Sequence, residues 1–246
     1  MLIKLLFTTL LLSSMLHAKS IKVAVAANVT YAIKALKTEF LKTHKDSRVD
    51  IIIGSSGKLT AQIVHGAPFD IFMSADMRYP QTLYKKGLTA TKPLVYAEGS
   101  LVYLSTQPRD FSKGLEMLKS KEIRHIAVAN PKTAPYGIAT DSALKSADIY
   151  KDIKSKFIYG ESIGQTLSYT LKAAQVGFIA KSALFSPRLK KFKDANHYRD
   201  VDRELYTPIK QGIVLLHKST QTQAFYDFIF SKKAKEILRE FGYNTP

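Results

Sequence analysis

The sequence predicts an α/β fold, and three observations point to it. Short apolar segments typical of strands alternate with segments whose apolar residues recur at helical spacing. The 246 residues, 46% of them hydrophobic and 23% charged, are enough for a buried core and unlike a disordered or fibrous chain. The chain has no cysteine, which excludes disulfides, thiolate metal sites and cysteine nucleophiles.

The first residues have the pattern of an export signal. Lys4 is followed by an apolar run over residues 5–16 and by the small residue Ala18. The run is shorter than the ~20 residues that span a bilayer. We therefore expect residues 1–18 to be a cleaved signal peptide and the mature chain to be exported; an uncleaved anchor is the alternative.

The elements expected after the signal follow one another in regular order. Residues 31–43 place Ile33, Leu36 and Phe40 on one helical face, and Gly87 ends a further helix. The alternation predicts parallel sheets. We expect strands at 21–27, 48–53, 69–73, 100–105, 125–129, 157–159, 176–179 and 212–216, and helices at 31–43, 59–64, 80–86, 139–145, 165–173 and 222–241.

Four expected strands run directly into a loop of small or polar residues and then a helix, at 26–30, 54–57, 130–137 and 160–164. Each junction leaves backbone N–H groups unpaired where helix dipoles carry partial positive charge. Several such junctions at the carboxyl ends of strands form a natural anion pocket. The alternative is that Asn28, Thr30 and Ser56 only cap helices, which is the commonest use of such residues.

Other motifs carry less weight. The 54–59 segment lacks the first glycine and the Ser or Thr of a phosphate-binding loop, because Ile52 and Leu59 occupy those positions. The histidines show no metal-ligand spacing. The net charge of +17 bears on partners and solubility, but the lysine clusters lack interleaved aromatic residues, so we expect no nucleic-acid partner.

The junctions, taken with a longer run, resemble a known family. Residues 26–28, 54–57 and the Gly-Ala-Pro-Phe-Asp-Ile-Phe-Met-Ser-Ala-Asp run at 66–76 are similar to segments of the periplasmic molybdate-binding proteins of ABC transporters. Residues 130–137, 161–165 and the closing Phe241-Gly242-Tyr243 continue the resemblance over essentially the whole mature chain.

The resemblance implies a two-lobed, periplasmic-binding-protein-like α/β fold with a ligand cleft between the lobes. Lobe I would comprise residues 19–98 and 207–246, and lobe II residues 99–206, with crossings near Glu98 and Tyr206. It also implies a monomer in the periplasm that is not an enzyme. Such a protein uses no cofactor, carries molybdate or tungstate as its ligand and delivers it to the permease of an ABC transporter.

The resemblance further implies how the oxyanion is held, without a cationic side chain. The ligand contacts would come from Asn28 and Ser56 and from the backbone of Tyr136 and Ile163, with the N–H of Ala27 or Ser55 as possible extras. Asn28 stands where much of the family has a serine, and Ala180 stands where some members have a tyrosine.

Three other functions stay open from the residues alone. The protein could bind another tetrahedral oxyanion, namely sulfate, thiosulfate or phosphate. A hydrolase using Ser56 would need a base, and no histidine lies in a comparable strand-end loop. A basic adhesion or membrane-surface module has only the charge of +17 in its favour.

Overall fold

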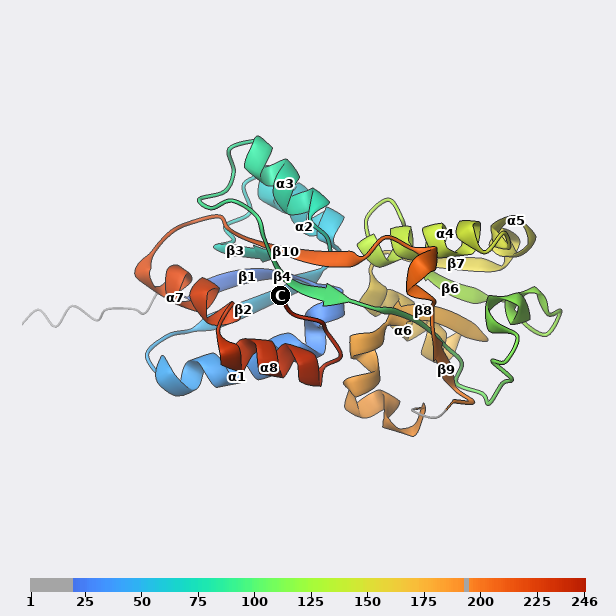
Figure 1. Cartoon of the computed structure of the whole chain (residues 1–246). Coiled ribbons are helices and arrows are strands. Elements are labelled where there is room, and N and C mark those ends of the chain that lie inside the picture. The colour runs from blue at the N-terminus through green and yellow to red at the C-terminus, as the bar shows by residue number, and fades with distance from the viewer. Residues whose placement is uncertain (1–19, 193–194) are drawn as a thin grey trace, which may run out of the picture.

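The computed structural model describes residues 20–192 and 195–246, and the expected signal peptide at 1–18 lies outside them. The strands form two five-stranded sheets that lie side by side (Figure 1). One sheet, in lobe I, contains β2 (Val49–Gly54), β1 (Ile21–Ala26), β3 (Ile71–Met73), β10 (Ile209–Leu215) and β4 (Leu94–Gly99), in that order. The other, in lobe II, contains β7 (Phe157–Gly160), β6 (Ile126–Ala129), β8 (Val176–Ala180), β5 (Leu101–Leu104) and β9 (Tyr198–Asp200).

Both sheets are mixed, so the expectation of parallel sheets is only half right. β1 is parallel to β2 and β3, and β6 is parallel to β7 and β8. β10 is antiparallel to β3 and β4, and β5 is antiparallel to β8 and β9. The antiparallel strands arise because the chain passes from one sheet to the other at β4–β5 and returns to the first at β10, so these strands are not joined by a helical crossover.

Helices cover both faces of each sheet, as parallel strands require. The α-helices are α1 (Thr30–Thr43), α2 (Ser56–Val64), α3 (Arg78–Lys85), α4 (Pro135–Ser146), α5 (Tyr150–Ile153), α6 (Ile163–Lys172), α7 (Thr220–Ile229) and α8 (Lys232–Glu240). Single-turn and short 3₁₀ segments are η1 (Ala27–Val29), η2 (Gly114–Lys119), η3 (Lys154–Lys156), η4 (Lys181–Phe185), η5 (Pro187–Phe192) and η6 (Arg203–Leu205).

The core follows the alternation of side chains along the strands. Val23 and Val25 pack with α1, α7 and α8 on one face of the lobe I sheet, while Ala24 faces α2 and α3 on the other. In lobe II, Leu101 and Tyr103 of β5 face the core beside α4 and α5. Because both faces are buried, the strands read as nearly continuous apolar runs.

Three elements differ from the sequence expectation. β4 and β9 were not expected: β4 is a half-exposed strand that pairs with β10 and, at Glu98, with Asn244, and β9 is a three-residue edge strand. The expected helix at 222–241 is two helices: α7 ends at Ile229, and Ser231 caps α8 by accepting a hydrogen bond from the Ala234 N–H at 3.2 Å.

The start of α7 is a capping box. The Ser219 hydroxyl oxygen accepts from the Thr222 N–H at 3.1 Å, and the Thr222 hydroxyl oxygen accepts from the Ser219 N–H at 2.8 Å. Two N–H groups that a helix start leaves unpaired are thereby satisfied. This cap places α7 against β10 and α1 in the lobe I core.

We expect Ser219→Ala to lower the free energy of unfolding by about 0.5–2 kcal/mol, because the cap is lost, while Ser219→Gly costs only a few tenths. Urea denaturation followed by circular dichroism measures the difference. Ser168→Ala is the control, since the Ser168 hydroxyl only donates to a carbonyl of its own helix. Equal stability of the alanine variant and wild type would contradict the role of this cap.

Candidate functional site

The four strand-to-helix junctions meet where the two lobes face each other. β1 leads into η1 and β2 into α2 in lobe I, and β6 leads into α4 and β7 into α6 in lobe II. Ala27 packs in the same buried cluster as Tyr136 and Ile163. The first-turn residues of helices from both sheets therefore converge on one region.

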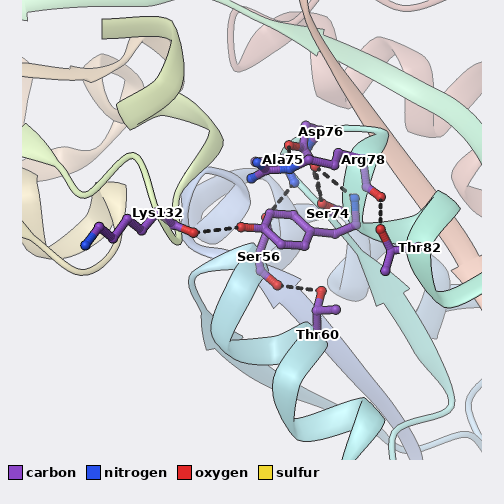
Figure 2. Close-up of polar contacts among 9 residues, drawn as sticks. Ser56, Thr60, Ser74, Ala75, Asp76, Arg78, Thr82 and Lys132 are labelled. Atoms are coloured by element: carbon purple, nitrogen blue, oxygen red, sulfur yellow. Dashed lines mark hydrogen bonds and ion pairs between the residues drawn. The ribbon is translucent and has the colours of Figure 1, made fainter. Parts of the chain in front are cut away.

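Direct hydrogen bonds join the lobes at this region. The Gly57 N–H of α2 donates to the Thr133 carbonyl of the loop before α4 at 2.9 Å. The Tyr79 hydroxyl donates to the Lys132 carbonyl at 3.3 Å. Figure 2 shows the Lys132 carbonyl facing lobe I, while the Lys132 side chain points away from it. These bonds hold the two lobes in contact beside a hollow of about 140 Å³ that Asn28 and Ile163 line.

Ser55 and Ser56, both expected site residues, play different local roles. The Ser55 hydroxyl oxygen caps α2 by accepting from the Lys58 N–H at 3.3 Å. The Ser56 hydroxyl oxygen accepts from the Ala75 N–H at 3.0 Å, and Ser56 is 1% exposed (Figure 2). Among the described residues, no acceptor is found for the Ser56 hydroxyl hydrogen, so this hydroxyl is free to donate.

The 74–78 loop holds Ala75 against Ser56. The Asp76 carboxylate accepts from the Ser74 hydroxyl at 3.3 Å and from the Tyr79 N–H at 3.4 Å, and it lies 3.6 Å from Arg78. Burial raises the pKa of Asp76 above its ordinary value, and these hydrogen bonds and Arg78 oppose the rise. The Ser-Ala-Asp run thus positions a donor behind the Ser56 hydroxyl.

The lobe II junctions supply backbone N–H groups at helix starts. Tyr136 lies in the first turn of α4, after Pro135 at the first position, and Ile163 is the first residue of α6. First-turn N–H groups have no acceptor within their helix. Within 20–192 and 195–246, the N–H groups of Ser56, Tyr136 and Ile163 show no hydrogen bond to another part of the chain.

Two cations near the junctions are paired with carboxylates, while Arg188 of η5 lines a hollow together with Asn28 and Ile163. Lys58 of α2 forms an ion pair across the cleft with Glu161, and Arg78 lies beside Asp76. The described residues contain no cluster of three metal-ligating side chains, and no described helix is long and apolar enough to cross a membrane. The junctions themselves therefore offer neutral backbone and side-chain donors.

Asn28 is held in a buried polar cluster that the sequence analysis did not foresee. Its Nδ2 donates to the Gln211 Oε1 at 2.9 Å and to the Tyr243 hydroxyl at 3.2 Å. The hydroxyls of Tyr243 and Ser182 each donate to the Asn28 carbonyl at 2.8 Å. The cluster, which also includes Tyr96 through its hydroxyl bond to Gln211, joins lobe I to Ser182 of lobe II.

Two members of this cluster, Gln211 and Tyr243, lie next to or within segments that the sequence analysis identified. Gln211 is a fully buried polar residue of β10, one position before the expected strand at 212–216 and next to a register shift. Tyr243 belongs to the closing Phe-Gly-Tyr motif. Burial raises the pKa of Tyr243 to about 12 and that of Tyr136 well above its ordinary value, so both hydroxyls keep their protons at neutral pH.

The remaining expected position, Ala180, ends β8 and is buried. It has no hydroxyl to offer, and the nearby Ser182 bonds to the Asn28 carbonyl instead. A hollow of about 750 Å³ lies elsewhere in lobe II, over β5 and β9. A small ligand held by the junctions would lie beside Asn28 and Ile163 and not in this hollow.

Two α/β lobes that meet around converging helix starts define a protein that encloses a small ligand between its lobes. The sequence matches the family described as "Bacterial extracellular solute-binding protein" over residues 21–244. The chain therefore belongs to this family of binding proteins.

Individual relatives agree with this assignment. The chain is 35% identical to the molybdate-binding protein ModA of Azotobacter vinelandii, over 95% of this chain and 93% of that one. It is 34% identical to ModA of Rhodobacter capsulatus, over 90% of this chain and 87% of that one. The solved structure of the A. vinelandii periplasmic molybdate-binding protein superposes with a TM-score of 0.84 at 30% identity, covering 92% of this chain and all of that one.

Gly99 lets the two lobes approach at the end of β4. A Cβ there would lie 2.1 Å from the Tyr136 hydroxyl oxygen of lobe II and 2.7 Å from the Gln211 Nε2 of lobe I. We expect Gly99→Ala to lower the free energy of unfolding by about 1–3 kcal/mol through overpacking. Thermal and urea denaturation measure it.

The double variant Gly99→Ala with Tyr136→Phe tests whether contact with the Tyr136 hydroxyl causes the loss of stability. Removing the hydroxyl takes away the atom that the new methyl group meets first, so part of the lost stability should return. If the two substitutions lower the free energy of unfolding additively, the Tyr136 hydroxyl does not clash with the new methyl group at residue 99.

Proposed function

We propose that this protein binds one molybdate or tungstate ion between its lobes and delivers it to the permease of an ABC transporter. The observation that carries the proposal is the convergence of unpaired first-turn N–H groups from both lobes, beside which Lys58 and Arg78 are paired with carboxylates. Relatives named molybdate-binding proteins, at 35% and 34% identity over nearly the whole chain, support the choice of oxyanion.

The ligand shell that we propose consists of the N–H and hydroxyl of Ser56, the N–H groups of Tyr136 and Ile163, and the Asn28 amide. The N–H groups of Ala27 and Ser55 are further candidates. A tetrahedral dianion accepts hydrogen bonds and offers none at neutral pH, so neutral donors fixed in place solvate it without a counter-charge. Each such charge-assisted bond contributes about 1.5–3 kcal/mol, and a handful of them offset the cost of association.

Pocket size sets the selectivity in this proposal. Molybdate, tungstate and sulfate have the same shape and charge, but sulfate is smaller and cannot reach donors from both lobes at once. Each donor left unpaired in a closed cleft is costly. Phosphate retains a proton that needs an acceptor, and the nearby carboxylates of Glu161 and Asp76 are engaged with Lys58 and Arg78.

We also propose where the protein acts and how its chain divides into lobes. A monomer would act in the periplasm after removal of residues 1–18. Lobe I would comprise 19–98 with 207–246 and lobe II 99–206, and the sheets support this division because β4 and β5 belong to different sheets.

We expect calorimetry to give one molybdate or tungstate per chain, with sulfate and phosphate at least about a hundredfold weaker because they leave donors unpaired. Thermal melting with the same oxyanions is the independent readout, since a tight ligand raises the melting temperature. Sulfate competing with molybdate at equal concentration would instead favour a general oxyanion carrier.

Ser56→Ala is expected to weaken molybdate binding by about 1–3 kcal/mol, because a buried donor to the ion is lost. Ser55→Ala removes only the cap of α2 and should reduce stability by about 0.5–2 kcal/mol with a smaller change in affinity. Calorimetry and urea denaturation of both variants separate the two effects. The opposite order of affinities would assign the ligand hydroxyl to Ser55.

A further inference from the structure

Three buried polar atoms around Asn28 have no hydrogen-bond partner among the described residues: the Asn28 Oδ1, the Tyr136 hydroxyl and the Gln211 Nε2. They belong to one cluster. The Tyr136 hydroxyl and the Gln211 Nε2 both lie against Gly99, and the Asn28 amide is near enough to the Tyr136 hydroxyl to oppose the rise in its pKa that burial causes. Buried polar groups are rarely left unpaired, so three in one cluster need an explanation.

The orientation of the Asn28 amide explains why these three atoms have no partner. Its Nδ2 points inward, to Gln211 Oε1 at 2.9 Å and Tyr243 at 3.2 Å, so both amide hydrogens are engaged. The Asn28 Oδ1 therefore points away from these partners and accepts no hydrogen bond from the described residues. An amide in this orientation has no N–H to offer an anion.

Rotating the Asn28 amide alone would not give every atom of the cluster a hydrogen-bond partner. Its Oδ1 would then face the Gln211 Oε1, which is itself an acceptor that already receives the Tyr96 hydroxyl at 2.8 Å. The two amides can only turn over together, because each needs the other to present the complementary atom.

We propose that Gln211 is a positioning residue that sets the orientation of the Asn28 amide, and that the two amides turn over together when the oxyanion binds. This inference rests on the proposed function. After a half-turn of both amides, the Gln211 Nε2 donates to the Asn28 Oδ1. The Asn28 Nδ2 takes the position now held by its oxygen and donates to the anion.

The same rotation provides partners for the other two atoms. The Gln211 Oε1 moves to the side of Gly99, where the Tyr136 hydroxyl is available to donate to it. The second Asn28 amide hydrogen faces the Tyr136 oxygen. All three unpaired atoms thereby gain partners. In exchange, the Tyr96 hydroxyl loses the Gln211 Oε1 as acceptor and the Tyr243 oxygen loses the Asn28 N–H. The anion favours the rotated arrangement because it repels an amide oxygen and attracts an N–H.

Nuclear magnetic resonance of protein labelled with ¹⁵N in Asn and Gln side chains tests the rotation directly. Without molybdate, the Asn28 amide hydrogens should show nuclear Overhauser effects to the Tyr243 ring. With saturating sodium molybdate, these effects should disappear, and the Gln211 amide hydrogens should show effects to the Tyr96 ring. Persistence of the Asn28–Tyr243 effects in the bound protein would overturn the inference.

Gln211→Met tests the role of Gln211, since it keeps the length of the side chain and removes both polar atoms. We expect molybdate affinity to fall by about tenfold or more, as for the loss of a hydrogen bond to a charged group. Gln223→Met is the control, because Gln223 only bonds to Asp227 of its own helix on the exposed face of α7. An affinity of Gln211→Met equal to that of the control would overturn the inference.

These outcomes separate the inference from the function on which it rests. Failure of the wild-type protein to bind molybdate would refute the proposed function itself. Tight wild-type binding with unmoved Asn28 amide signals would leave the function standing and refute only the amide rotation. If Gln211→Met does not fold, the wild-type resonances still decide the question.

Discussion

The hydrogen bond from the Gly57 N–H to the Thr133 carbonyl sets how the two lobes meet. It joins the first turn of α2 to the loop before α4, so two of the four junctions are held in one alignment. Residue 57 must be glycine for this contact, because a Cβ would lie 2.8 Å from the Tyr79 hydroxyl and 3.0 Å from Thr133. Without so close an approach, donors from the two sheets could not surround one small ion.

An anion site built from neutral donors places strict demands on its surroundings. Its N–H groups must be left unpaired by the fold, yet every other polar group nearby must be satisfied, since an unpaired buried group costs about 1–3 kcal/mol. The 74–78 loop meets this demand for Ser56, and the Tyr243 and Ser182 hydroxyls meet it for the Asn28 carbonyl. The unpaired atoms of Asn28, Tyr136 and Gln211 are the exception, and they lie beside the proposed ligand shell.

Much of the fold could be predicted because local patterns determine it. The expected helix at 31–43 and the expected strand at 21–27 agree with α1 and β1 to within about a residue at each end, since helical spacing and an unbroken apolar run leave little choice. β4 escaped prediction because its residues are half-exposed and its partners, β10 and Asn244, are more than a hundred residues away in sequence. The break at Ser231 escaped because the apolar spacing continues through it.

The sequence by itself determined the α/β class, the four junctions and their small residues, because these depend on periodicity and on residues a few positions apart. The tertiary structure alone decided which donors remain free, that Lys58 and Arg78 are paired with carboxylates, and that Gln211 lies behind Asn28. Asn28 and Gln211 are 183 positions apart, and only the packing of β10 against η1 and the carboxyl-terminal Tyr243 brings their amides together. A hydrogen bond depends on distance and direction in space, and no local pattern encodes either across such a separation.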